Sequence, residues 1–145
     1  MFEIAKRLAQ AVTDKTGLPC FVEPFKVVPD APHYRLTLVS VAPALNGLQS
    51  VVRFQLLFVV KGSAPEATTT VIGQNAYRLS RWVLDHKPAE FAPGVKAYVS
   101  LVPGTRSGWS QPGNEEKSDA PVFTGESFLD LEFDSQELAS YLQEI

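Results

Sequence analysis

Apolar residues recur at helical spacing near both ends of the chain. The first stripe repeats every three or four positions and comprises Phe2, Ala5, Leu8, Ala9 and Val12. This spacing predicts an amphipathic helix. Gly17, with Pro19 just beyond it, is a common way for such a helix to end. At the other end of the chain, residues 134–137 form a capping box that opens a short C-terminal helix with its own apolar stripe.

The longest predicted helix lies in the middle of the chain. Residues 63–66, Ser-Ala-Pro-Glu, combine a capping box with an early proline. We expect the helix to run from Ser63 to about Lys87, because the next residue is a proline that lacks a backbone donor. Arg78 and Arg81 lie on its polar face.

Apolar positions at strand spacing predict five strands between and after these helices. The strands span residues 20–28, 33–41, 48–61, 96–102 and 122–133. Pro24 cannot donate a ladder hydrogen bond, so the first strand is predicted either to lie at a sheet edge or to be broken. Residues 36–39 are apolar on both faces, which predicts that the second strand lies inside the sheet. Asn46-Gly47, between the second and third predicted strands, supplies the positive φ that a tight hairpin turn requires.

The order of these elements predicts an α+β fold in a single domain, residues 1–145. We expect a mainly antiparallel sheet of about five strands. Two principal helices pack on one face, and the short C-terminal helix follows the last strand. Residues 103–121 form a long polar stretch rich in glycine, proline and serine, which predicts a mobile loop.

The composition is that of an ordinary soluble globular domain. Of the 145 residues, 45% are apolar and 20% are charged, so one core is expected. The longest unbroken apolar run, residues 56–60, is far shorter than the roughly 20 residues that a membrane span needs. Charges within the first helix argue against a secretory signal. Cys20 is the only cysteine, which excludes an internal disulfide and fits a cytosolic protein.

The net charge of −3 conceals an asymmetry along the chain. Residues 1–113 carry twelve Lys and Arg against seven Asp and Glu, a net of +5. Residues 114–145 carry Lys117 against nine acids, a net of −8. Two interpretations stay open. Either the charges offset each other within one fold, or a basic face of one subunit meets an acidic face of the next in a head-to-tail contact.

No segment carries a catalytic pattern. The chain has no phosphate-binding loop, no dinucleotide-binding turn and no nucleophile elbow. Cys20 and His33 have the residue types of a nucleophile and a base, but a buried cysteine beside a strand-start histidine is the commoner outcome. We therefore predict no catalytic, cofactor-binding or metal-binding residues, and a protein that is not an enzyme.

Charged residues on two predicted elements are candidates for a subunit or partner interface. The last strand places Glu126, Asp130 and Glu132 on one face at period two. That strand has no histidine or lysine, so an exposed or interface face is favoured over acid–base catalysis. Arg78 and Arg81 are too few for a nucleic-acid-binding patch and are assigned to the interface instead.

Trp109 is the other interface candidate. It lies in the predicted loop, among residues that bury little surface. A large aromatic side chain in such a loop either anchors a contact with a partner or packs back onto the sheet, and both interpretations stay open.

The order and size of the predicted elements resemble the tail terminator proteins of long-tailed bacteriophages, of the lambda type. The likeness is carried by the helix of residues 2–12, the strand of residues 51–60 that leads into the helix of residues 63–87, and the strand of residues 123–133. It covers most of the chain and depends on element order, without a diagnostic motif.

This resemblance implies a structural role in the virion tail, after assembly in the host cytoplasm. Proteins of this family form a homohexameric ring on the last ring of the tail tube. The ring stops tube polymerisation and offers a joining surface to the head–tail connector, without a cofactor or a membrane. DNA passes through an electronegative lumen without specific binding. Glu115, Glu116 and Asp119 of the long loop are the lumen candidates that the resemblance suggests.

Two alternatives belong to other classes. The chain is compatible with a different ring component of the same particle, a head–tail connector or stopper. It is also compatible with a small ligand-binding protein or enzyme that uses the concave face of the sheet. A discrete apolar pocket with converging polar groups would favour this last alternative.

Overall fold

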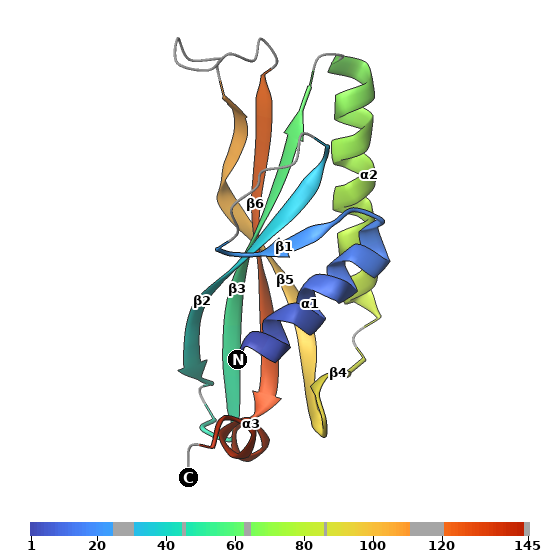
Figure 1. The fold of residues 1–145 in the computed structure, drawn as a ribbon. Helices are drawn as coiled ribbons and strands as arrows, with labels where there is room; N and C mark the ends of the chain where they lie inside the picture. Colours follow the sequence, from blue (N-terminus) through green and yellow to red (C-terminus); the bar gives the residue numbers. More distant parts are fainter. Residues whose placement is uncertain (25–30, 45, 63–64, 86, 111–120, 144–145) are drawn as a thin grey trace.

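The computed structural model describes residues 1–24, 31–44, 46–62, 65–85, 87–110 and 121–143. Within them the chain folds into a twisted sheet with helices on one side (Figure 1), so the predicted α+β class is confirmed. In chain order the elements are α1 (Phe2–Thr16), β1 (Cys20–Val22), β2 (His33–Pro43), β3 (Gln49–Lys61), α2 (Pro65–Leu84), β4 (Ala89–Ala92), β5 (Val95–Ser110), β6 (Val122–Asp134) and α3 (Ser135–Leu142).

The sheet differs in detail from the predicted one. Its six described strands run in the order β1-β2-β3-β6-β5-β4. All neighbours are antiparallel except β1, which is parallel to β2. The prediction of about five strands missed β4, whose four residues are too short to show a period. The mainly antiparallel sheet that was predicted is observed apart from this one parallel pair, β1 with β2. The β1 strand lies at a sheet edge, one of the two outcomes predicted from Pro24.

The largest correction concerns the predicted loop of residues 103–121. Residues 103–110 continue β5 and pair with β6, from Pro103 opposite Ser127 to Ser110 opposite Val122. The register shifts between Pro103 and Ser107. Pro103 therefore lies beside an irregularity of the ladder, where the absence of its backbone N–H is tolerated. Glycine and serine weaken strand propensity, but the neighbouring strand supplies the hydrogen bonds. The rest of the predicted loop, residues 111–120, lies outside the described residues.

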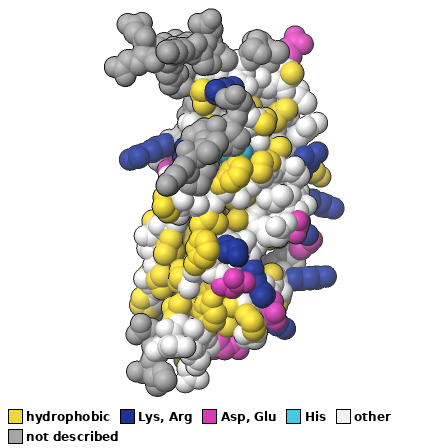
Figure 2. Space-filling view, in the orientation of Figure 1, with side chains coloured by type: hydrophobic (Ala, Val, Ile, Leu, Met, Phe, Trp, Pro, Cys, Tyr) yellow, Lys and Arg dark blue, Asp and Glu magenta, His cyan; other side chains and the backbone are white. Residues whose placement is uncertain are grey.

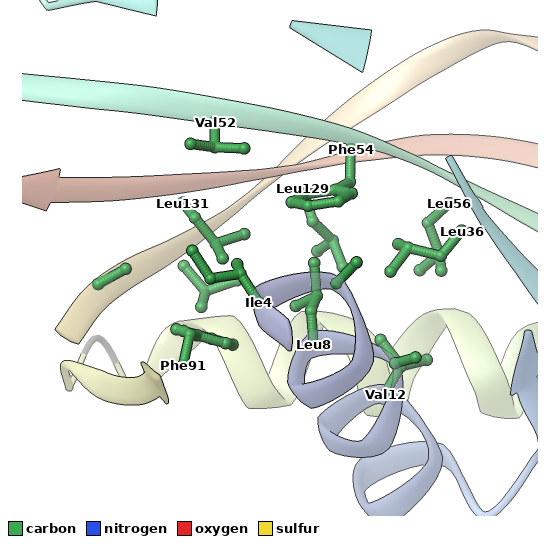
Figure 3. Close-up of a cluster of buried hydrophobic side chains, with 14 of the residues drawn as sticks. Ile4, Leu8, Val12, Leu36, Val52, Phe54, Leu56, Phe91, Leu129 and Leu131 are labelled. Atoms are coloured by element: carbon green, nitrogen blue, oxygen red, sulfur yellow. The ribbon is translucent and has the colours of Figure 1, made fainter. Parts of the chain in front are cut away.

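The core lies between α1 and the central strands (Figure 3). Leu8 and Val12 of the predicted stripe point toward the sheet together with Ile4, and all three side chains are fully buried. Phe2, predicted in the stripe, is instead exposed, because the buried side of α1 is turned toward Ile4. The sheet meets them with alternate side chains of β3 and β6, among them Phe54 and Leu129. Burial of these large apolar side chains is the main stabilising contribution to such a fold.

Two helix ends follow the sequence signals. Gly17 adopts a left-handed conformation with φ 78°, and its N–H donates to the carbonyl of Thr13. The Asp134 side chain accepts hydrogen bonds from the backbone N–H groups of Gln136 and Glu137, and thereby caps α3. The α2 helix ends at Leu84, three residues before the predicted end. Ser63, predicted to cap α2, lies outside the described residues.

Candidate functional site

The sheet has two different faces. The buried residues of α1 and α2 pack on the face that carries Phe54, Phe58 and Leu129. Side chains at the alternate positions of β3 and β6 point to the opposite side, and no described helix packs on them. We call this second surface the open face. Its central members are Arg53, Gln55, Glu126, Phe128, Asp130 and Glu132.

An ion pair lies at the centre of the open face. Arg53 and Asp130 are opposite each other in the β3–β6 ladder. The Nε and Nη2 atoms of Arg53 donate to the two carboxylate oxygens of Asp130 at 2.8 and 2.9 Å. The same guanidinium lies 5.3 Å from the centre of the Phe128 ring, within the range of a cation–π contact. The hydrogen bond to Asp130 raises the pKa of Arg53, and the guanidinium balances the charge of the Asp130 carboxylate.

Glu126 is held by groups of its own chain. The Gln55 amide Nε2 donates to one carboxylate oxygen at 2.7 Å. The backbone N–H groups of Thr105 and Arg106, in the irregular part of β5, donate to the other oxygen at 3.3 and 3.4 Å. These hydrogen bonds, that of Gln55 first, lower the pKa of the Glu126 carboxyl. Glu126 is therefore a fixed anion on the open face.

Glu132 is the third acid predicted from the last strand. It lies on the open face, opposite Val51 of β3 and Tyr98 of β5, and is partly exposed. The structure thus places all three predicted acids on one surface. It also shows a feature that sequence periodicity did not reveal, because the cation that neutralises Asp130 comes from β3. The sequence did show Arg53 on the polar side of its strand. Which residue lies opposite Arg53 depends on the pairing register, which the sequence pattern does not give.

The predicted cations lie on the other side of the molecule. Arg78 and Arg81 are both exposed on α2, which covers the buried face of the sheet. Arg78 has a structural task, since its Nη1 donates to the carbonyl of Thr16 at the end of α1 at 2.8 Å. That bond satisfies a C-terminal helix carbonyl with a cation. Only Arg81 of this pair is therefore suited to a clean test of partner binding.

Trp109 packs against its own sheet. Its ring meets Phe123 edge-to-face, with ring centres 5.5 Å apart. A Cβ atom added at Gly62 would lie 2.7 Å from the indole Cη2, so this glycine leaves room for the ring. The side chain is still 45% exposed. Of the two interpretations, packing onto the sheet is the one that the structure shows, although nearly half of the residue stays accessible.

Cys20 and His33 do not form a catalytic pair. Cys20 pairs in register with Tyr34, whose side chain lies in the core, whereas the adjacent residue His33 points to the opposite side of the sheet. His33 Nδ1 is 3.0 Å from the carbonyl oxygen of Ala31. Burial raises the pKa of the Cys20 thiol to about 12, so the sulfur is protonated and a poor nucleophile at neutral pH.

A pocket of about 250 Å³ lies between α2 and the buried face of the sheet. Its walls are mostly apolar and include Phe58, Leu79 and Phe123. At its base the buried Tyr34 hydroxyl donates to Asn75 Oδ1 at 3.3 Å, and burial raises the pKa of Tyr34. The sequence did not single out this pair, because its members are 41 positions apart.

Other chemical features are sparse within the described part of the chain. No group of three or more His, Cys, Asp or Glu residues there is arranged to hold a metal ion. None of the helices among these residues is both long and apolar enough to cross a membrane. The lumen candidates Glu115, Glu116 and Asp119 lie outside the described residues. Neither the protein-family models nor the curated proteins compared with this chain give a match.

Proposed function

We propose that this chain is the ring-forming subunit of a bacteriophage tail terminator. The observation that supports the proposal most is the separation of charge across the sheet. Glu126 and Glu132 lie on the open face, and Arg81 lies on α2 on the opposite side. A subunit with opposite charges on opposite sides can place its acidic surface against the basic surface of the next copy. Repetition of such a head-to-tail contact closes a ring when the rotation allows it.

The contacts on the open face indicate which acids would take part in the proposed contact between ring subunits. Asp130 is neutralised by Arg53, so it adds little net charge to a contact. Glu126 keeps its charge and is fixed by Gln55 and two backbone donors. A fixed ion loses less conformational entropy on binding than a mobile one. Glu126 and Glu132 are accordingly the acids assigned to the subunit contact, with Arg81 as their opposite.

In this proposal the ring sits on the end of the tail tube in the virion. It stops further polymerisation of the tube protein, presents its other side to the head–tail connector, and lets DNA pass without specific binding. The subunit number is expected to be six. Glu115, Glu116 and Asp119 are assigned to the lumen, where negative charge repels the DNA backbone.

Particle mass and shape test the proposal directly. Light scattering and negative-stain electron microscopy of the purified protein, alone and with purified tail tubes, are expected to show rings or capped tubes. Rings that bind the head–tail connector but ignore tubes would indicate a connector or stopper instead. A monomer that also fails to bind tubes would overturn the ring proposal.

The pocket under α2 favours a second candidate, a small ligand-binding protein. It combines apolar walls with the Tyr34–Asn75 pair at its base, the combination typical of small-molecule sites. Ala76 lines the pocket and is exposed, so Ala76→Trp should obstruct it without disturbing the core. A monomer whose thermal unfolding is shifted by small phenolic or alkyl compounds, with the shift lost in Ala76→Trp, would support this candidate over the ring.

A further inference from the structure

Residues 37–43, the lower half of β2 in Figure 1, form a sheet edge with no described neighbour on its outer side. The short strand β1 pairs only with residues 34–36 of β2. There the outward backbone groups are satisfied, since the Tyr34 N–H donates to the Pro19 carbonyl and the Leu36 carbonyl accepts from the Glu23 N–H, both at 2.8 Å. The next outward groups in the alternation belong to Leu38, beyond the end of β1. Among the described strands, none pairs with residues 37–43 on that side.

The same edge exposes large apolar side chains. Leu38, Val39 and Val41 are 46%, 50% and 49% exposed. Leu48, in the turn after β2, and Phe2, at the start of α1, are also exposed. Figure 2 shows hydrophobic side chains gathered over the lower half of β2 and the beginning of α1. An open edge beside a continuous apolar patch is a surface that soluble proteins usually protect or use for binding.

The usual protection of such an edge is weak here. Natural edge strands carry charged side chains, especially lysine, that oppose pairing with another chain. The segment from Leu36 to Val52 contains no charged residue. The one irregularity is a register shift between Leu38 and Ser40, and Pro43 ends the strand. These features shorten the edge without making it repulsive.

We propose that this edge pairs with the same edge of a second copy of the chain. In an antiparallel pairing across a two-fold axis, each residue faces a residue of the identical segment. Like charges placed opposite each other oppose pairing, and a segment without charges avoids that repulsion. The pairing adds backbone hydrogen bonds and brings together Leu38 and Val41 of both copies. The contact is separate from the proposed ring contact, which uses the open face and α2.

The length of the edge determines how tightly two copies of the chain are expected to associate. Only about seven residues are available, and a register shift interrupts them. We therefore expect a weak association that depends on protein concentration, with slower exchange of the outward amides of this stretch, that of Leu38 first, as the concentration rises. The exchange measurement needs no substitution, so it is independent of whether any variant folds.

Sedimentation velocity of the whole chain, with Val41→Lys and Tyr77→Lys, tests the pairing. Tyr77 is an exposed apolar residue on α2, away from the edge, so its replacement controls for added charge and lost apolar surface. Val41→Lys is expected to weaken pairing about tenfold or more, because it brings a charge to an apolar contact. Tyr77→Lys should leave the pairing unchanged.

Three results would overturn edge pairing. They are a wild-type chain that stays monomeric with exchange of the outward Leu38 amide independent of concentration, equal losses in Val41→Lys and Tyr77→Lys, or a concentration-dependent association that Val41→Lys does not affect. A six-subunit ring that persists in Val41→Lys while the further association between copies is lost would support edge pairing as a contact separate from the ring.

Discussion

Arg53 and Asp130 meet across the β3–β6 ladder through two parallel hydrogen bonds, in the geometry in which a guanidinium and a carboxylate fit each other best. The pair joins the two central strands on the side of the sheet that no described helix covers. It therefore fixes the side chains of the surface that we assign to subunit contact. The rest of that surface is arranged around it, with Phe128 against the guanidinium.

The coupling between these two residues can be measured in a double-mutant cycle. Arg53→Gln and Asp130→Asn are each expected to lower the denaturant midpoint. The double variant should lose less than the sum, because both single changes remove the same two hydrogen bonds. The coupling should decrease as salt is added. Losses that simply add, at low and high salt alike, would contradict a direct interaction.

Glu126 should make stability depend on pH. Its folded pKa is lowered by the hydrogen bond from Gln55 and by the backbone donors of Thr105 and Arg106. The carboxylate therefore stabilises the fold above the ordinary glutamate pKa of about 4.3, and this contribution is lost as pH falls through the lowered value. Chemical unfolding of wild type and Glu126→Gln between neutral and acidic pH should give curves that converge on acidification. Gln55→Leu should reduce the same difference, and parallel curves would refute the assignment.

Cys20 should be chemically inert in the folded protein. Because burial raises its thiol pKa to about 12, alkylation by iodoacetamide at about pH 8 is expected to be slow and to accelerate in denaturant. As pH rises above the ordinary thiol value, ionisation favours the unfolded chain, so stability should fall. Ser100 is exposed on β5, and Ser100→Cys in a Cys20→Ala background provides a reactive control. Equal rates for the two thiols would rule out a protected Cys20.

The Asp134 cap should contribute measurably to stability. Its side chain accepts from two N–H groups at the start of α3, so Asp134→Ala should cost about 1 kcal/mol of unfolding free energy. Asp134→Asn keeps an oxygen acceptor and is expected to retain most of that stability. Urea unfolding of the three proteins measures the effect. If Asn and Ala are equally destabilising, the cap is not the cause.

Charge reversal tests the ring contact. Arg81→Glu and Glu132→Lys should each weaken assembly or tube binding by about tenfold or more, because each places like charges in contact. The combined variant should recover part of the loss if the two residues meet. Arg78 is left intact because it binds the Thr16 carbonyl, and Lys6→Glu, exposed on α1, serves as the control. In a complementation assay, overlong tails would mark failure to terminate, and normal tails from both reversals would oppose the proposed contact.

Local patterns determined much of the fold. The spacing from Phe2 to Val12 placed α1, the alternation from Val52 to Val60 placed β3, and Gly17 and Asp134 marked helix ends, as the structure confirms. Each signal depends on a residue and its near neighbours in the chain, through side-chain period or backbone conformation. The same alternation correctly put the last-strand acids on one face, although whether that face binds another subunit stays a prediction.

Tertiary structure decided what depends on residues far apart in the chain. Residues 103–110 have the composition of a loop but form a strand, because β6 lies beside them and satisfies their backbone groups. Asp130 is neutralised because the register brings Arg53 opposite it, 77 positions away. Arg78 caps α1 because α2 packs beside it. In each case local sequence sets the chemical groups and the face on which they lie. Packing selects the partner, because hydrogen bonds and ion pairs form with whatever lies within about 3 Å in the folded chain.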